Sequence, residues 1–208
     1  MFAIAAGRYE ALRADPMAIT NEVILRGALR HLAVMSSFKQ NMSEADVLAE
    51  IRANRPPGEG RLQMAELYAR QDRLVDAALT RGDREGAFEL GTSWRHIEDI
   101  MAEGEQPQWP TRFFHYAPKF GEKVGYGPAG LHDPVAVAAF AAYLELWTPE
   151  RFAAAAERYA NPKRRDWPGM TKELEAHIAG LDANLFRDFK TYILAAAAAR
   201  AGMLVWMS

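Results

Sequence analysis

The sequence predicts an all-α protein: one domain folded as a single irregular helical bundle or a short stack of helical hairpins, with one long ordered aromatic loop. Two observations predict this class. Apolar side chains recur at helical spacing through most of the 208 residues, and no stretch alternates convincingly between apolar and polar residues. The helical periodicity disappears over residues 104–133. We therefore expect helices over 1–103, a long loop over 104–133 and helices again over 134–208.

The first helices are placed by their start signals. The pattern over residues 2–14 predicts a short helix that ends before Asp15-Pro16. Asp15 is a good N-cap and Pro16, at the first helical position, loses no hydrogen bond, so a long helix is expected from there to about residue 40. Ser43 opens the sequence Ser-Glu-Ala-Asp, a near capping box, which predicts another helix to about residue 54.

Two more helices are expected before the loop. The helical spacing of apolar residues predicts one helix over 61–81 and a second over about 84–103, with a break at Gly82-Asp83. Because this break is short, the two helices are expected to be antiparallel neighbours.

The segment after the loop also opens on a start signal. Asp133-Pro134 combines a cap with a proline, and the helix that it begins is apolar nearly all round, which is typical of the centre of a core. Thr148-Pro149 begins the next helix. Two further helices are expected over 171–180 and, capped by Asp182, over 183–200.

The carboxyl-terminal residues are strongly apolar. Gly202 stands where a left-handed helix cap is expected. The residues after it are expected to dock on the core as a helix or a short extended segment. If they were exposed, Met203–Trp206 would be a sticky patch through which a homodimer could form.

Composition limits the classes of function. The chain contains no cysteine, which excludes disulfides, thiolate metal sites and a cysteine nucleophile and fits a reducing cytosol. A net charge of −2 and a pI near 6.2 give no electrostatic footprint for nucleic acid or an anionic membrane. The most apolar run, 192–207, is shorter than the ~20 residues of a membrane helix, and the amino terminus lacks a signal peptide. We expect a soluble cytoplasmic protein with neither nucleic acid nor membrane as partner.

The predicted loop is the candidate functional segment. It holds five of the eleven prolines, two of the five histidines and a dense set of aromatic residues. A loop longer than about 12–15 residues is usually functional or disordered, and disordered segments are poor in aromatic residues. We therefore expect an ordered loop that packs over helices on both sides.

The candidate binding residues of this loop are aromatic or basic: Trp109, Arg112, Phe114, His115 and Tyr116. Aromatic residues and arginine carry most of the binding energy at protein interfaces. The alternative is that the rings attach the loop to its own core. One face of the loop could serve each role.

A glycine pattern in the loop matches a phosphate-binding motif. Residues 125–130 read G-x-G-x-x-G, which in dinucleotide-binding folds follows a strand and opens a helix. Here no strand is expected before it, Pro128 lacks an N–H, and the next helix begins only after Asp133. We interpret the segment as a flexible turn, and we expect no cofactor.

The histidines do not form a metal-binding motif. None of the five belongs to a His-Glu-x-x-His or a Glu-x-x-His pattern, so metal binding would need unrelated segments to converge. His177 lies four residues after Glu173 and is interpreted as one member of a helix-surface pair. No metal is expected.

A polar patch is predicted beside Trp94. Arg95, His96 and Asp99 lie on or near one helix face, and the simpler interpretation is a surface ion pair between Arg95 and Asp99. The functional interpretation is a patch that meets the loop through His115 or His132.

Three functions remain open. The first is a non-enzymatic bacterial interaction protein, such as an immunity or antitoxin-type protein that binds and occludes a protein partner. The missing catalytic signature, the mild acidity and the aromatic loop motivate it. The alternative is an enzyme or small-ligand-binding protein with a pocket between the 104–133 loop and the helices, built from His115, His132, Tyr116, Arg112 and His96. The least favoured is a regulator that touches nucleic acid through Arg164 and Arg165.

Overall fold

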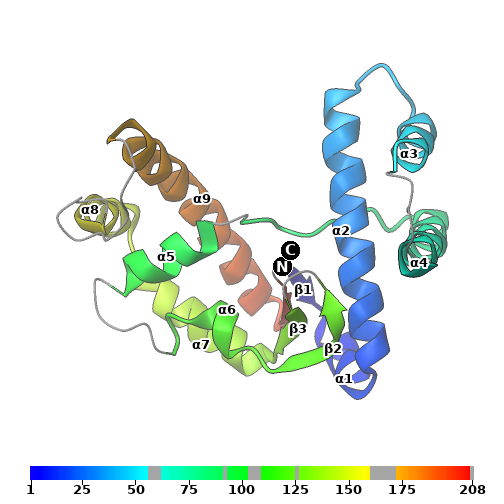
Figure 1. Cartoon of the computed structure of the whole chain (residues 1–208). Coiled ribbons are helices and arrows are strands. Elements are labelled where there is room, and N and C mark those ends of the chain that lie inside the picture. The colour runs from blue at the N-terminus through cyan, green and yellow to red at the C-terminus, as the bar shows by residue number, and fades with distance from the viewer. Residues whose placement is uncertain (56–61, 91–92, 103–108, 125–126, 160–171, 207–208) are drawn as a thin grey trace.

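The computed structural model describes residues 1–55, 62–90, 93–102, 109–124, 127–159 and 172–206 (Figure 1). Most of these residues are helical, which confirms the helical part of the predicted fold class. The predicted all-α class holds only in part, because four short strands form one small antiparallel sheet. No helix among the described residues is both long enough and apolar enough to span a membrane.

The helices differ widely in length. Two of them, α2 and α9, extend along most of the molecule, whereas α6 is a single turn (Figure 1). Their bounds are α1 Ala6–Ala14, α2 Pro16–Phe38, α3 Glu44–Ala53, α4 Leu62–Thr80, α5 Ser93–Met101, α6 Phe113–Tyr116, α7 Pro134–Glu145, α8 Pro149–Tyr159 and α9 Lys172–Ala198.

The sheet joins the two ends of the described chain. Its strands are β1 (Phe2–Ile4), β2 (Lys119–Val124), β3 (Gly127–His132) and β4 (Gly202–Val205), in the spatial order β1-β4-β3-β2. All three pairings are antiparallel. Phe2 pairs with Leu204, so the first and last strands are neighbours.

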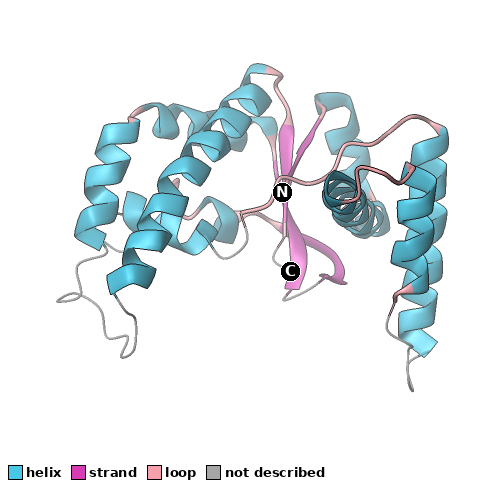
Figure 2. Ribbon diagram, turned by 90° about the horizontal axis from the view of Figure 1, so that it is seen from above, coloured by secondary structure: helices cyan, strands magenta, loops and turns pink. Residues whose placement is uncertain are grey.

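Helices cover both faces of the sheet (Figure 2). Leu204 of β4 packs with residues of α1 and α2, whereas Met203 and Val205 pack with residues of α7 and α9. Alternate side chains of an extended strand point to opposite faces, so a strand between two helical layers is apolar on both sides. This arrangement explains the continuous apolar sequence of β4.

The burial of β4 excludes the exposed patch considered above. Met203, Leu204 and Val205 are each at most 2% exposed. The predicted exposure of these residues is therefore wrong for Met203–Val205, which form the core of one chain, and Trp206 is partly buried against that core. The expectation that the segment docks on the core in extended form is confirmed.

The predicted helix starts are confirmed at each described cap. Asp15 accepts the N–H of Met17, and Ser43 accepts the N–H of Asp46. In the second half of the chain, Asp133 accepts the N–H of Ala136, and the hydroxyl of Thr148 accepts the N–H of Arg151. These signals succeed because a cap acts within one helical turn and needs no tertiary partner.

Two predicted helices in the first half are wrong at their amino-terminal ends. Residues 2–4 form β1 instead of the start of a helix, and residues 83–90 are not helical. The second segment runs beside β1 and α2: Phe88 exchanges backbone hydrogen bonds with Met1, and Ala87 donates to the carbonyl of Arg26. A Cβ on Gly86 would lie 2.7 Å from the Cα of Arg30, so this close contact with α2 requires glycine.

The expected antiparallel pairing of the helices over 61–81 and 84–103 is also wrong. The first of these, α4, packs on α2, whereas α5 packs against α8 and α9 in the other helical group (Figure 1). The extended residues between them carry the chain from one helical group to the other.

The carboxyl-terminal helices differ from the prediction as well. Residues 172–198 form one continuous helix, α9, in place of two. The left-handed residue that ends it is Arg200, with φ of 52°, and not Gly202. Gly202 lies in β4, where an added Cβ would lie 2.8 Å from the ring of Tyr9 and 2.9 Å from the carbonyl oxygen of His132. Glycine is therefore required there for close packing of the sheet.

The prediction of a long loop over 104–133 is wrong for the described residues of this segment. It contains α6 and the hairpin of β2 and β3. Residues 127–130 of the glycine pattern belong to β3, whereas Gly125 and Tyr126 lie outside the described residues. The interpretation as a flexible turn is therefore wrong for 127–130. Gly-Pro-Ala-Gly is a poor strand sequence by intrinsic propensity. Its extended conformation is decided by pairing with β2 and, at Gly130, with β4.

Candidate functional site

Two buried polar side chains bind one peptide group of α6. Glu98 of α5 accepts the N–H of Phe114 at 3.0 Å through Oε1. His132 of β3 binds the carbonyl oxygen of Phe113 through Nε2 at 2.5 Å. The N–H and the carbonyl belong to the same peptide bond. The single turn of α6 is therefore held from two sides by groups that come from different elements.

Glu98 also pairs with the next side chain of α6. Its Oε2 lies 2.9 Å from Nδ1 of His115. Glu98 is 2% exposed, and burial raises the pKa of its carboxyl from an ordinary value of 4.5 to about 8, although the Phe114 N–H and the charge of Arg112 act to lower it. Near neutral pH, the Glu98 carboxyl therefore keeps its proton in the folded protein.

His132 is held neutral by its surroundings. Its ring is 2% exposed and stacks on Phe113 with the ring centroids 4.0 Å apart. Burial and, to a lesser extent, the positive charge of Lys119 lower the pKa of His132 from 6.5 to about 4, against the raising effects of the Phe113 carbonyl and of Asp133. Because that carbonyl only accepts hydrogen bonds, Nε2 carries the proton and Nδ1 keeps its lone pair.

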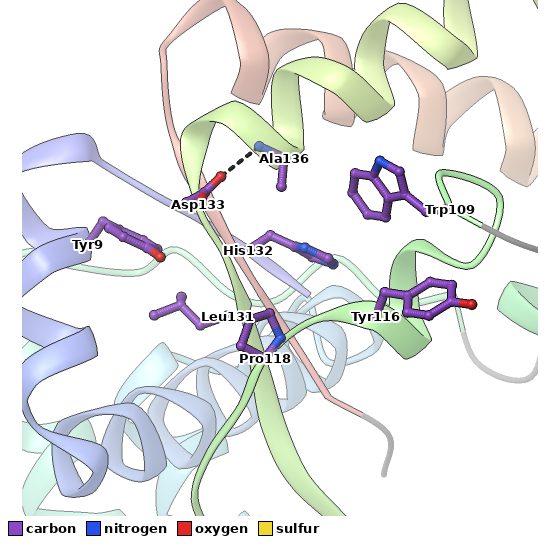
Figure 3. A pocket seen from close by; sticks show the side chains of 8 residues that line it. All are labelled: Tyr9, Trp109, Tyr116, Pro118, Leu131, His132, Asp133 and Ala136. Carbon is purple, nitrogen blue, oxygen red and sulfur yellow. Dashed lines mark hydrogen bonds between the residues drawn. The ribbon is translucent and has the colours of Figure 1, made fainter.

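A pocket of about 320 Å³ opens beside His132 (Figure 3). We call it the aromatic pocket. Tyr9 of α1 stands on one side of it, and Trp109 and Tyr116 stand on the other. The remaining lining residues are Pro118, Leu131, Asp133 and Ala136. The pocket thus lies where the segment before β2, strand β3 and the helices α1 and α7 meet.

The aromatic pocket has an exposed rim and a buried floor. Trp109 is 40% exposed and Tyr116 is 54% exposed, whereas Tyr9 is 7% exposed. Asp133 also lies at the surface, and its Oδ1 accepts the N–H of Ala136 at the start of α7. A ligand would therefore meet the two exposed rings and the carboxylate first.

The structure distributes the predicted site residues over two places. Trp109, Tyr116 and His132 converge on the aromatic pocket. His115 lies on the other side of α6, with its ring 5.1 Å from Trp94 and its Nδ1 on Glu98. The contacts with His115 come from Trp94 and Glu98, which belong to the same helix as the predicted patch of Arg95, His96 and Asp99.

The other predicted residues do not line the aromatic pocket. Phe114 is 8% exposed and packs between Trp94 and Phe189, so it belongs to the core. Arg112 acts electrostatically on Glu98. His96 lies near Tyr159 of α8, with ring centroids 6.3 Å apart.

Some predicted residues lie outside the described part of the chain. They are the side chains of Arg95 and His177, together with the whole of Arg164 and Arg165. Within the described ranges, no three histidine, aspartate or glutamate side chains are grouped as metal ligands.

The sequence analysis did not identify Glu98 or Tyr9 as site residues. It identified Asp133 as a helix cap and not as a residue of the pocket. Glu98 had a signal, since it follows Trp94 by four residues and therefore lies on the apolar face of its helix. A carboxylate on an apolar face is buried and needs a partner. Tyr9 had no such signal in the sequence, because only the tertiary fold brings it to residues 109–136.

Comparison with known proteins finds no matching family, no similar curated protein and no similar solved structure.

Proposed function

We propose that this chain is a protein-interaction protein and that the aromatic pocket, with Trp109 and Tyr116 at its rim, is its binding surface. The observation that carries the proposal is the contrast between these exposed rings and the buried framework that holds them. Phe113, three residues before Tyr116, is fully buried and stacks on Phe140 with ring centroids 4.2 Å apart. Large rings left exposed by a well-packed segment are available to a partner.

The framework positions the rings before any partner binds. The peptide between Phe113 and Phe114 is bound by His132 and Glu98, which fixes the turn that carries Tyr116. Trp109 lies 5.7 Å from the His132 ring. Preorganised aromatic side chains lose little conformational entropy on binding, and tryptophan and tyrosine are enriched among residues that dominate binding energy.

One more apolar side chain is exposed near the pocket in the sequence. Val135, at the start of α7, is 77% exposed and directly precedes the pocket residue Ala136. A partner that covered the rings and Val135 would bury the apolar surface of each, which favours association.

An immunity or antitoxin role is the specific form of this function that we propose. In that role, the chain would cover the active surface of a bacterial toxin. The mild acidity of the chain, with a net charge of −2, and the rigid exposed rings support it. Such proteins act by occupying a surface and need no catalytic group of their own.

The second candidate is an enzyme or small-ligand-binding protein that uses the same pocket. Its volume of about 320 Å³ lies at the lower end of the range of ~300–1,000 Å³ for ligand sites. It contains His132, whose Nδ1 lone pair is a potential proton acceptor, and Tyr9, whose pKa is raised by burial and by Asp133. Titratable groups with shifted pKa values often mark functional sites.

Site-specific photo-crosslinking tests the first candidate. The photoreactive residue p-benzoylphenylalanine is placed at position 116 and, as a matched control, at position 38. Phe38 is also aromatic, is 80% exposed and ends α2 away from the pocket. In the native host, we expect one protein to be crosslinked from position 116 and not from position 38.

The crosslinking result separates the two candidates. Equal crosslinking from both positions, or none from position 116, would contradict the interaction proposal. Native mass spectrometry of the purified protein then tests the second candidate. A bound small molecule that is lost in a Tyr9→Phe/His132→Gln variant would favour a ligand site.

A further inference from the structure

The aromatic pocket presents hydrogen-bond acceptors and ring faces to its occupant. Nδ1 of His132 carries a lone pair, since Nε2 donates to Phe113. Asp133 uses Oδ1 to cap α7 at 2.6 Å, and Oδ2 accepts no hydrogen bond from any described residue. The hydroxyl of Tyr9 points toward His132 (Figure 3). A ligand that donates several hydrogen bonds would match this set.

None of the described residues that line the pocket is basic. Lys119 lies close enough to influence His132, but its ammonium group donates to the carbonyl of Phe114 and is not among the lining residues. Arg13 and Glu10, near Tyr9, form a surface pair with each other at 4.0 Å. Asp133 is therefore the one charged residue in the described lining, and the pocket favours a positive charge.

We propose that the aromatic pocket receives an arginine side chain of the partner protein. Its guanidinium would stack on the exposed ring of Trp109 or Tyr116 and donate to Oδ2 of Asp133 and to Nδ1 of His132. A guanidinium is planar, weakly hydrated and carries five N–H donors, so it suits a site of ring faces and dispersed acceptors better than a compact ammonium does.

The chain uses the same chemistry within its own fold. The guanidinium of Arg26 lies 4.1 Å from the ring centre of Phe2 and is bonded to the carboxylates of Glu22 and Asp83. Arg55 lies 4.6 Å from the ring centre of Tyr68 and is bonded to Asp72. In both cases an arginine combines an aromatic face with a carboxylate. The aromatic pocket has both of these parts and no arginine of its own among its lining residues.

A titration with N-acetyl-arginine N′-methylamide tests this inference directly. Binding is followed by the indole N–H signal of Trp109 in NMR spectra of the ¹⁵N-labelled full chain, assigned with a Trp109→Phe variant. The comparison probe is the citrulline analogue, which has nearly the same shape but no charge. We expect saturable shifts of the Trp109 signal with the arginine probe and at least about fivefold weaker binding of citrulline.

Two asparagine substitutions provide the matched pair. Asp133→Asn removes the charge of the pocket but keeps a good N-cap, so the helix is preserved. Asp15→Asn makes the same change at the other Asp-Pro helix start, outside the pocket lining. We expect Asp133→Asn to weaken arginine binding at least about fivefold and Asp15→Asn to leave it unchanged.

Several outcomes would overturn the inference. They are equal binding of the two probes, unchanged binding in Asp133→Asn, or no shift of the Trp109 signal at all. The inference rests on the proposed interaction function, and the two fail separately. Crosslinking from position 116 to a partner, without arginine binding, rejects only the arginine anchor. Failure of both experiments rejects the interaction surface as well.

Discussion

Glu98 and His132 bind opposite ends of a single peptide group. Glu98 accepts its N–H from Phe114, and His132 donates to its carbonyl on Phe113. Both side chains are 2% exposed, and their pKa values are shifted in opposite directions, to about 8 for Glu98 and about 4 for His132. The stability of the fold around α6 therefore depends on pH through two contributions of opposite sign.

The first prediction concerns Glu98 and alkaline pH. Its carboxyl keeps its proton in the folded state up to a pKa of about 8 but loses it near 4.5 when unfolded, so the contribution of Glu98 to folding stability falls as the pH rises from 4.5 to 8. The full contribution is on the order of 5 kcal/mol. In a Glu98→Gln variant, which cannot ionise, this decline should disappear. Urea unfolding at a series of pH values measures it.

The second prediction concerns His132 and acidic pH. Its ring stays neutral when folded, with a pKa of about 4, but gains a proton near 6.5 when unfolded, so stability is lost as the pH falls from 6.5 to 4. The loss is about 3 kcal/mol in full. In the wild type, the Glu98 contribution partly cancels it between pH 4.5 and 6.5. Glu98→Gln should therefore be more acid-sensitive than the wild type, and the double variant with His132→Gln should not.

The third prediction compares two glycines by their surroundings. Gly202→Ala places a Cβ 2.8 Å from the ring of Tyr9 and should destabilise the protein by about 1–3 kcal/mol. Gly27→Ala, in the interior of α2 with nothing within 4 Å of the added Cβ, should stabilise it by about 0.5–1 kcal/mol. Thermal unfolding of both variants measures the difference. Stabilisation by Gly202→Ala would contradict the close packing of Tyr9 on β4.

The fourth prediction concerns the buried guanidinium of Arg26. Its side chain is 3% exposed and bonds Glu22, Asp83 and the carbonyl of Glu85. Arg26→Met removes the donor from Oε1 of the buried Glu22, whose Oε2 keeps Arg8, and from the partly buried Asp83. It should cost about 3–5 kcal/mol, measured by urea unfolding. Arg84→Met, which breaks an exposed pair with Glu44, is the control and should lower the free energy of unfolding far less, because solvent screens that pair. Equal effects of the two changes would show that burial does not strengthen the Arg26 network.

The sequence by itself determined where most helices begin. Asp15-Pro16, Ser43, Asp133-Pro134 and Thr148-Pro149 each start a helix because a cap, followed in three of the four by a proline, acts on neighbouring backbone groups. It also identified Trp109, Tyr116 and His132 as candidate binding residues, since aromatic residues and histidine are recognisable by residue type. The sequence did not show that these three residues converge on one pocket.

Tertiary structure alone decided the sheet and the site. Strands β1 and β4 are only three and four residues long and lie at opposite ends of the described chain, so their pairing has no local signal. The same is true of Tyr9 opposite Trp109, and of Glu98 beside the Phe113–Phe114 peptide. Caps and periodicity reflect interactions within a few residues, whereas these contacts form only when distant segments bury their apolar faces against each other.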